Sequence, residues 1–369
     1  MNFDELLKHS STVAAGRGPH DKIVISSRIR FARNLAPFVF PGWAKRPERQ
    51  RALAAIRPVV EQLPEMQPCF SATMEALSQQ EKQLLVERHL ISREHASKNV
   101  GSGVVINREG TLSVMINEED HLRMQALKSG LQLENAFKLL DKVDTELEQH
   151  LDYAFSPKLG YLTACPTNVG TGLRASAMLH LPGIVLSDQI NQVIQSVGKL
   201  GLAVRGLYGE GTEALGNLFQ ISNQITLGER EGEILERLRK VILQIIEHEE
   251  NARLVLLEKR PRLVYDQIGR AYGILTNARA ISSKEALNLL SLVRMGADLG
   301  MFPQGTQTLT DELFILTQPA HVQQGVERKL TAEERDLRRA DIIRARLKDL
   351  PPPSEESANP GSSAGLTTV

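Results

Sequence analysis

The chain has 369 residues, of which 41% are hydrophobic and 24% charged, so it can bury one large core or two moderate ones. Lys and Arg total 44 and Asp and Glu also total 44, which leaves no net field to attract nucleic acid or an anionic membrane. The two cysteines, Cys69 and Cys165, are too few for a disulfide framework and fit a reducing compartment. No stretch has the apolar length of a signal peptide or a spanning helix. We therefore expect a cytoplasmic globular protein with neither a nucleic-acid nor a membrane partner.

The first 230 residues are typical of a sheet protein. After a lead segment at 1–20, the β-branched run 23–25 predicts a strand that delivers arginines at its end, in residues 26–30. Residues 112–116 alternate in the same way and are followed by the acidic run 117–121. Further strands are expected at 160–164, 173–180, 202–208 and 218–227, the last with Asn223 as a turn. Helical periodicity between these strands is weak. The strands follow one another without regular helical crossovers, so the fold class predicted for 21–230 is α+β, with a mostly antiparallel sheet flanked by helices.

The pattern changes to helical spacing from residue 231, where apolar residues recur from Ile234 to Ile246. More helices are expected at 284–297 and 332–347. Thr331, with Glu334 three residues later, predicts a capping box at the start of the last helix. The prolines from Pro351 end that helix, and the Ser-, Gly- and Pro-containing segment 351–369 lacks the apolar content to fold. The sequence thus predicts a helical C-terminal domain at 231–350 and a disordered tail.

The familiar nucleotide-binding signatures are missing: the sequence has no GxxxxGK[ST] loop, no GxGxxG after a strand and no HRD or DFG element. Arginines near the ends of predicted strands offer another cradle, because a planar guanidinium binds phosphate oxygens bidentately and stays charged. An arginine in a sequence is nevertheless usually a solvated surface charge. The candidates are Arg28, Arg30, Arg123, Arg174 and Arg205.

Acidic residues and a thiol could complete such a site. Glu118 and Glu119 directly follow a predicted strand, at a sheet rim where sites commonly form, although a solvated turn gives the same pattern. Cys165 heads the Gly- and Thr-rich segment 165–172, and a lone cysteine is more often a small buried hydrophobe than a reactive group. Glu210 lies between glycines, which suits either a mobile loop or a plain surface turn.

Four ordered blocks resemble the guanidino phosphotransferases, the family of creatine and arginine kinases: SSRIR at 26–30, NEEDHLR at 117–123, CPTNVGTGLRAS at 165–176 and RGLYGEG at 205–211. The similarity to the bacterial protein arginine kinases is greater and spans nearly the whole chain. It is carried also by HLIS at 89–92, FQISNQITLG at 219–228, ILTQP at 315–319 and RDLRRA at 335–340.

The resemblance implies a role for each matching residue. The five arginines would hold the phosphates of ATP and His89 would line the nucleotide site. Glu119 and Glu210 would clamp the acceptor guanidinium with Glu119 as base, Glu118 would reach Mg²⁺ through water, and Cys165 would act electrostatically as a thiolate. The neighbouring positions implied in ATP binding are Ser26, Ser27, Ile29, Ala175, Ser176, Ala177, Met178, Gly206, Leu207, Tyr208, Gly209 and Glu210.

The RDLRRA helix is implied to be an allosteric phosphoarginine pocket. Arg335 and Arg339 share a helix face and could hold a phosphate while Asp336 faces a guanidinium or a backbone amide. A solvated helix face with i,i+4 charge pairs is the alternative. The full pocket would comprise Arg335, Asp336, Leu337, Arg338, Arg339 and Ala340.

The first arginine block begins at Ser26, so few residues precede it that could close over a small free guanidine. The resemblance therefore implies an open site that accepts arginine in proteins. It further implies clients marked for regulated proteolysis in the stress response, a zinc-binding activator protein, an AAA+ protease unfoldase and a homodimer. A phosphagen-type kinase of free arginine and an inactive phosphoarginine-binding adaptor are the alternatives.

Overall fold

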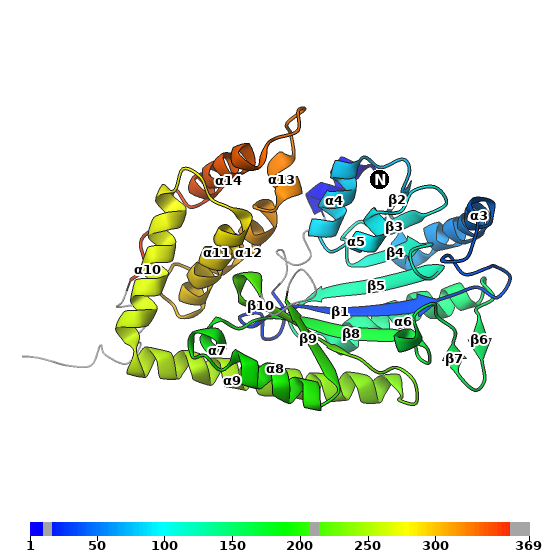
Figure 1. The fold of residues 1–369 in the computed structure, drawn as a ribbon, viewed down its shortest axis with the longest axis horizontal. Helices are drawn as coiled ribbons and strands as arrows, with labels where there is room; N and C mark the ends of the chain where they lie inside the picture. The colour runs from blue at the N-terminus through cyan, green and yellow to red at the C-terminus, as the bar shows by residue number, and fades with distance from the viewer. Residues whose placement is uncertain (10–16, 207–213, 355–369) are drawn as a thin grey trace, which may run out of the picture. The chain divides into compact units, whose positions relative to one another are not determined.

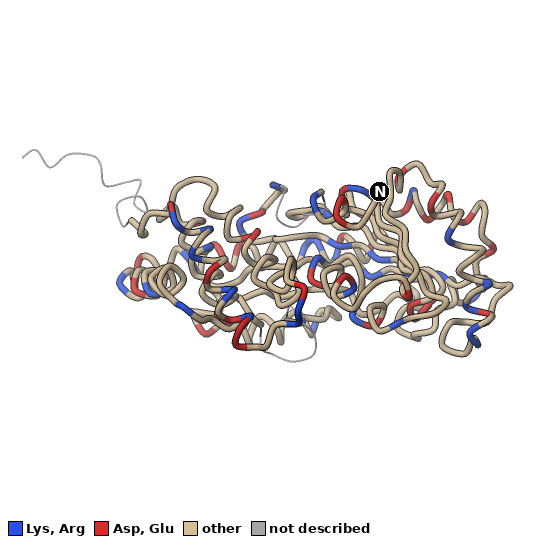
Figure 2. The backbone as a smooth tube through the Cα atoms, turned by 90° about the horizontal axis from the view of Figure 1, so that it is seen from above, with Lys and Arg blue, Asp and Glu red and all other residues tan. Residues whose placement is uncertain are grey.

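The computed structural model describes residues 1–9, 17–206 and 214–354. The packing of the chain separates it into two compact units. The first contains Met1–Leu179, Asn191–Thr212 and Phe219–Glu247, and the second contains His180–Ile190, Glu213–Leu218 and His248–Val369. Figure 2 shows that basic and acidic positions are interspersed along the described chain, as expected from the balanced charge.

The first unit is built on an eight-stranded sheet (Figure 1) whose strand order is β2-β3-β4-β5-β1-β8-β10-β9. Neighbours from β2 to β8 pair antiparallel, and so do β9 and β10. The strands are β1 (Val24–Arg33), β2 (Cys69–Thr73), β3 (Gly103–Asn107), β4 (Leu112–Ile116), β5 (Leu122–Ser129), β8 (Leu173–His180), β9 (Leu202–Gly206) and β10 (Leu218–Asn223). A separate hairpin consists of β6 (Phe155–Ser156) and β7 (Gly160–Tyr161).

Helices cover this sheet. α6 runs along one face against β1 and β5 (Figure 1), and its apolar stripe from Leu133 to Leu147 is buried. A second apolar cluster joins β2, β3 and β4 to the helices around Leu6, Leu85 and Ile91. In chain order up to residue 230, the helices and 3-10 turns of the described residues are α1 (Phe3–His9), α3 (Arg46–Gln62), η1 (Pro64–Met66), α4 (Gln79–Glu87), α5 (Arg93–Ala96), α6 (Leu133–Glu148), η2 (Pro166–Asn168), α7 (Pro182–Leu186), α8 (Ile190–Lys199) and η3 (Leu215–Asn217). Of these, α7 and η3 belong to the second unit.

The second unit is helical. It holds the C-terminal part of α9 (Glu231–Lys259), α10 (Pro261–Asn277), α11 (Ser283–Asp298), α12 (Thr306–Leu316), α13 (Pro319–Gln323) and α14 (Ala332–Arg346). α11 packs between α10 and α12, and α14 contacts α10, α12 and α13. A buried ionic network reinforces this packing, in which Arg253 pairs with Glu249 at 2.6 Å and with Asp298 at 3.0 Å.

The predicted α+β class is confirmed, with a large antiparallel sheet and a helical C-terminal region. The predicted apolar stripe from Ile234 to Ile246 is buried, and Thr331 and Glu334 form the predicted capping box. The expected domain boundaries remain predictions. Among the described helices, none combines the length and apolar character needed to cross a membrane.

Three details of the prediction were wrong. β1 continues to Arg33, so its arginines lie within the strand and not at its end, because the polar residues alternate with buried ones. β7 ends earlier than expected, at Tyr161, and β10 ends at Asn223, where a turn was expected, with no strand in residues 224–227. Helices α3 and α6 lie between strands where helical periodicity was judged weak. α3 carries polar residues on most of its surface, which conceals its narrow apolar stripe.

Candidate active site

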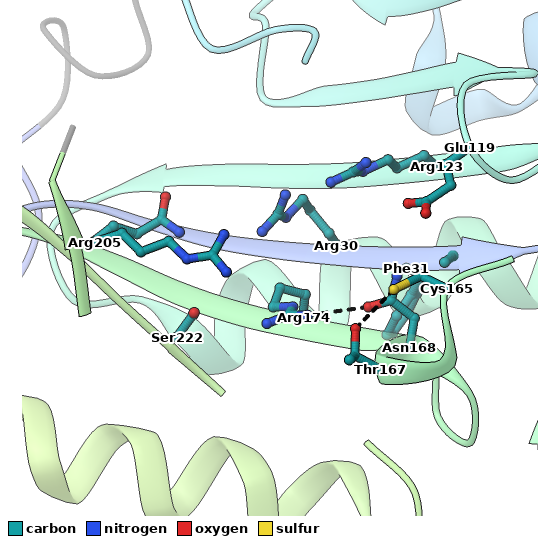
Figure 3. Close-up of a pocket in the computed structure, with 13 residues that line it drawn as sticks. Arg30, Phe31, Glu119, Arg123, Cys165, Thr167, Asn168, Arg174, Arg205 and Ser222 are labelled. Carbon is teal, nitrogen blue, oxygen red and sulfur yellow. Dashed lines mark hydrogen bonds between the residues drawn. The ribbon is translucent and has the colours of Figure 1, made fainter. Parts of the chain in front are cut away.

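Strand register brings the predicted arginines onto one face of the sheet. In β1, Arg28 and Arg30 are two residues apart and therefore point the same way. Arg30 lies directly opposite Arg174 of β8, and Ala32, on the same face, lies opposite Arg123 of β5. Cross-strand partners in an antiparallel sheet share a face. Figure 3 shows the side chains of Arg30, Arg123, Arg174 and Arg205 reaching into one space.

Of the arginines on this face, Arg123 pairs with Glu118 at 2.8 Å. Among the described residues, Arg28, Arg30, Arg174 and Arg205 form no ion pair, and the buried Nε of Arg30 has no hydrogen-bond partner. Burial, together with the charge of Arg123, lowers the pKa of Arg28 to about 10. Burial and the charges of the neighbouring arginines lower the pKa of Arg30 well below its ordinary value. Cations held together in this way are suited to an anionic ligand.

Three hydrogen bonds to neutral groups orient Arg28 and Arg174. The Nη2 of Arg28 donates to the side-chain oxygen of Gln220 at 2.6 Å. Arg174 donates to the backbone oxygen of Asn223 at 2.8 Å and to the side-chain oxygen of Asn168 at 3.3 Å. Burial, followed by the charges of Arg205 and Arg123, lowers the pKa of Arg174. These partners are neutral, so they position the guanidinium groups without cancelling their charge.

The acidic turn between β4 and β5 contains two buried carboxylates, Glu118 and Asp120, and one exposed carboxylate, Glu119. Glu118 is 1% exposed and accepts two hydrogen bonds of 2.8 Å from Nη1 of Arg123 and one from the hydroxyl of Ser92. Burial opposes its ionisation, but Arg123 and Ser92 outweigh burial and lower its pKa. Glu119 is exposed, and Figure 3 shows its carboxylate directed into the same space as the arginines.

A buried polar hub joins this turn to the segment that carries Cys165. The carboxylate of Asp120 accepts from Asn34 Nδ2 and from the backbone N–H of Ala164, both at 2.6 Å. Asn34 in turn accepts from the backbone N–H of His121 at 2.9 Å and donates to the backbone oxygen of Leu162 at 3.1 Å. The residues on either side of Glu119 and Cys165 are therefore connected through a few short bonds.

The segment with Cys165 folds back on β1. The Sγ of Cys165 lies 3.1 Å from Thr167 Oγ1, and both side chains face the arginine cluster in Figure 3. Gly172 closes the segment with φ +65°, and a Cβ there would lie 2.5 Å from Nη1 of Arg33. Arg33 also donates to the backbone oxygen of Thr171 at 2.9 Å. Only glycine permits this close approach, which places the thiol beside the cationic face.

Two adjoining cavities follow from this arrangement. The smaller, of about 240 Å³, is lined by Glu119, Cys165 and Asn168 as well as by arginines. The larger, of about 770 Å³, extends along β1 past His89, Ser92 and Glu118. Both cavities are lined by Arg30, Glu119, Arg123, Arg205 and Gln220. The site is thus one continuous hollow, with cations along its length and the acid and the thiol at one end.

The remaining residues predicted to bind ATP differ in whether they face the cavities. His89 lines the larger cavity, and burial, aided by the charge of Arg28, lowers its pKa to about 4, so it is neutral at pH 7. Ser176 and Met178 follow Arg174 on the same face of β8, whereas Ile29, Ala175 and Ala177 are buried on the opposite face. Ser26 and Ser27 are buried, and Gly206 lines the larger cavity. Leu207, Tyr208, Gly209 and Glu210 lie outside the described residues.

The RDLRRA helix, α14, carries side chains of two kinds. Arg339 is 2% exposed and donates to the backbone oxygens of Thr317 and Ile281, at 2.7 and 2.8 Å, and to Asp336 at 2.5 Å. Arg335 and Arg338 each donate to a single backbone oxygen, Arg338 from a more exposed position. Leu337 is 44% exposed and Ala340 is buried. Arg339 therefore holds helices together in this conformation, and the predicted phosphoarginine pocket remains a prediction.

Sequence reasoning missed several residues of the site. Gln220 and Ser222 line the smaller cavity, and their spacing of two in β10, with Gln220 paired to Arg205, was the available signal. Asn34 and Asp120 were missed as a hub because the 86 residues that separate them leave no trace in local pattern.

The arrangement suits a polyanionic nucleotide with a polar acceptor beside its phosphate end. Fixed guanidinium groups can hold phosphate oxygens in line, and the acid beside the thiol can receive a cationic acceptor. Among residues 1–9, 17–206 and 214–354, no three His, Cys, Asp or Glu side chains gather in a group that could hold a metal ion. Glu118, already paired with Arg123, fits only an outer position, through the water that Mg²⁺ retains when phosphates bind it.

Comparison with known proteins is consistent with this chemistry. The family model described as "ATP:guanido phosphotransferase, C-terminal catalytic domain" matches residues 54–252. The model described as "Protein-arginine kinase McsB C-terminal domain" matches residues 261–358. The proteins named "Protein-arginine kinase" from Halothermothrix orenii and Symbiobacterium thermophilum are each 46% identical over 94% of this chain and 99% of their own length.

Solved structures show the same fold. A lombricine kinase aligns with a TM-score of 0.56 at 25% identity, over 65% of this chain and 71% of its own. The duplicated taurocyamine kinase from Schistosoma mansoni, with bound components of a transition-state analogue, aligns with a TM-score of 0.58 at 20% identity, over 81% and 49%. Three of the four arginine- and carboxylate-bearing blocks lie within residues 54–252, and the RDLRRA block lies within residues 261–358.

Proposed function

The chain belongs to the protein-arginine kinase family, and from that premise we propose that it transfers the γ-phosphoryl group of ATP to arginine guanidinium groups exposed in loosely folded proteins. The observation that supports the proposal is the group of arginines on one sheet face, most of which form no ion pair among the described residues, together with Glu119 and Cys165 in the same cavity. ATP is the phosphoryl donor of this family of enzymes, and proteins are its acceptors.

The arginines would hold the triphosphate. Phosphoryl transfer places negative charge on the equatorial oxygens and needs the attacking and leaving atoms in line. Arg30 and Arg174, opposite each other in the sheet, would both bind the phosphates, and Arg123 is oriented by Glu118. Because the sheet fixes the backbone of these residues, little reorganisation is needed when charge develops.

Glu119 would receive the acceptor. Arginine has a pKa of about 13.8, so neutralising it in advance at pH 7 would cost about 9 kcal/mol. Proton removal must therefore accompany attack on phosphorus, and the exposed carboxylate of Glu119, which faces the arginines in Figure 3, would take the proton from the attacking nitrogen. Cys165, as a thiolate, would hold the guanidinium electrostatically. Glu210, outside the described residues, is proposed as the second carboxylate of the clamp.

Magnesium is proposed as the companion of ATP, held mainly by phosphates and waters, with Glu118 in the outer position. The ion would neutralise part of the negative charge of the phosphates. Glu118 itself orients Arg123 and, through the Glu119 backbone N–H that donates to it at 2.8 Å, steadies the base.

We further propose the biological setting implied by the family resemblance. Clients would be marked in the cytoplasm for regulated proteolysis during the stress response. The partners would be a zinc-binding activator and an AAA+ protease unfoldase, and the chain would form a homodimer. The RDLRRA helix would bind phosphoarginine and report it to the kinase.

The deciding experiment offers ATP and Mg²⁺ together with either free arginine or an unfolded protein, and detects acid-labile phosphate by mass spectrometry under conditions that preserve phosphoramidates. We expect phosphoarginine in the protein. Phosphate on the free amino acid alone would refute the proposal. A Glu119→Gln variant serves as the matched control, since it keeps the arginine face but removes the base.

A further inference from the structure

The segment between β1 and α3, residues 36–44, exposes large apolar side chains. Trp43, the one tryptophan of the sequence, is 88% exposed, and Val39 is 47% exposed. An isolated exposed apolar residue is ordinary, but apolar residues grouped at the rim of a site mark a surface that contacts another molecule.

This segment packs on His121. The rings of Phe38 and Phe40 lie edge-on to the imidazole, with centroids 6.0 and 6.1 Å away. The imidazole Nδ1 accepts from the backbone N–H of Leu35 at 3.2 Å, and the backbone of Val39 bonds to the same ring. These contacts anchor the segment to His121 while the side chains of Trp43 and Val39 remain exposed.

The same contacts place the segment beside the acceptor end of the site. His121 is two residues after Glu119, so Phe38 and Phe40 pack on the turn that carries the base. Gly42, next to Trp43, lines the cavity together with Glu118, Glu119 and Ala164. A Cβ built on Gly42 would meet nothing within 4 Å, so the cavity is open at this point. A chain that delivers an arginine to Glu119 has room to pass Gly42 and reach Trp43.

We propose that residues 36–44 are a docking surface for the polypeptide that carries the acceptor arginine, and that its occupant is an extended client segment with a large apolar side chain close to that arginine. This inference rests on the proposed function and deepens it by naming the substrate class. Gly42, the neighbour of Trp43, and Glu119 line the same cavity, so an extended chain that delivers its arginine to Glu119 can lay a nearby side chain on Trp43. Folded proteins bury such side chains, whereas unfolded ones expose them, and the surface thereby selects loosely folded clients.

A neighbouring hairpin could lengthen this surface. Phe155 and Leu159, 55% and 42% exposed, lie on the β6–β7 hairpin and its turn. The base of that hairpin is tied to the start of the docking segment by the bridge between Leu35 and Tyr153. Two separate loops thus expose apolar side chains from one common base.

The test uses two peptides with the same central arginine, one flanked by leucines and one by serines, and measures kcat/KM for phosphorylation of each. We expect the wild-type protein to favour the leucine peptide about tenfold or more, equivalent to about 1.4 kcal/mol, as expected for one aromatic contact. Trp43→Ala should lose most of this preference while the serine peptide and the KM for ATP are unchanged. Trp43→Phe should retain most of it, and Leu200→Ala, which removes an exposed apolar residue that lines neither cavity, should change nothing.

Three results would overturn the inference, and they are distinguishable. An unchanged leucine-to-serine ratio in Trp43→Ala would show that the segment does not dock the substrate. A change in sedimentation coefficient caused by Trp43→Ala would instead assign the surface to a second copy of the chain. No transfer by the wild-type protein to any arginine peptide or unfolded protein would refute the proposed function itself.

Discussion

The unneutralised arginines of β1 should make the nucleotide-free protein less stable than it could be. Arg28 is charged at pH 7 in both the folded and the unfolded protein, but burial and Arg123 lower its pKa in the fold from 12.5 to about 10. That shift corresponds to at most about 3 kcal/mol of destabilisation, present at every pH below about 10 and relieved only as pH rises toward 12.5. Replacing Arg28 with methionine removes this cost and one hydrogen bond to Gln220, worth about 1 kcal/mol.

We therefore expect Arg28→Met to raise the free energy of unfolding by about 1–2 kcal/mol in the absence of nucleotide. ATP at 100 times its Kd stabilises the wild-type protein by about 2.7 kcal/mol, and the variant, lacking a phosphate ligand, should lose much of this gain. The order of stability should thus reverse when ATP is added. Denaturant unfolding in a buffer free of phosphate and sulfate, with and without ATP, measures both values.

Arg33 provides a matched control on the same strand. It lies on the opposite face of β1, is 1% exposed and pairs with Asp144 at 2.6 Å. Arg33→Met strands a buried carboxylate and should cost about 3–5 kcal/mol. If Arg28→Met unfolds more readily than the wild-type protein without nucleotide, the reasoning about the unpaired cluster is refuted.

The fold class followed from sequence, and the blocks that carry the predicted site residues could be recognised, because both rest on local signals. Alternation identified β8 as 173–180, and the order of arginines and acids along the chain identified the blocks. The cross-strand register did not follow. That Arg30 lies opposite Arg174, and not one residue to either side, depends on how all eight strands pack.

The polar hub around Asp120 shows why the rest of the site was not predictable. Asp120 was expected only as part of a charged run, yet burial raises its pKa while Asn34 and Ala164 bond to it. Its partners come from segments 86 and 44 residues away. No periodicity in a single sequence encodes such distances, whereas the capping box at Thr331 and Glu334 spans three residues and was predicted correctly.

Three further predictions follow from particular side chains. Glu119→Gln should lower kcat for arginine phosphorylation by a factor of about 10²–10⁴, because the base is lost, with little change in ATP affinity, because the arginines remain. The rate of phosphoarginine formation measures the first effect and nucleotide titration measures the second. Burial lowers the pKa values of His95 and His121 from 6.5 to about 4, so the unfolded protein binds more protons than the folded protein between pH 4 and pH 6.5. The free energy of unfolding should therefore fall as pH drops from 6.5 to 4, which urea midpoints at several pH values measure. The decline should be shallower in His121→Gln. Arg339→Ala should destabilise the helical unit by about 3 kcal/mol or more, because the buried carbonyls of Thr317 and Ile281 and the carboxylate of Asp336 lose their donor. Arg338→Ala removes one exposed hydrogen bond and should cost less than about 1 kcal/mol. Thermal unfolding of the two variants separates the structural from the ligand-binding role of α14: equal stability of both variants would show that Arg339 is not a structural residue and is free to act as a ligand.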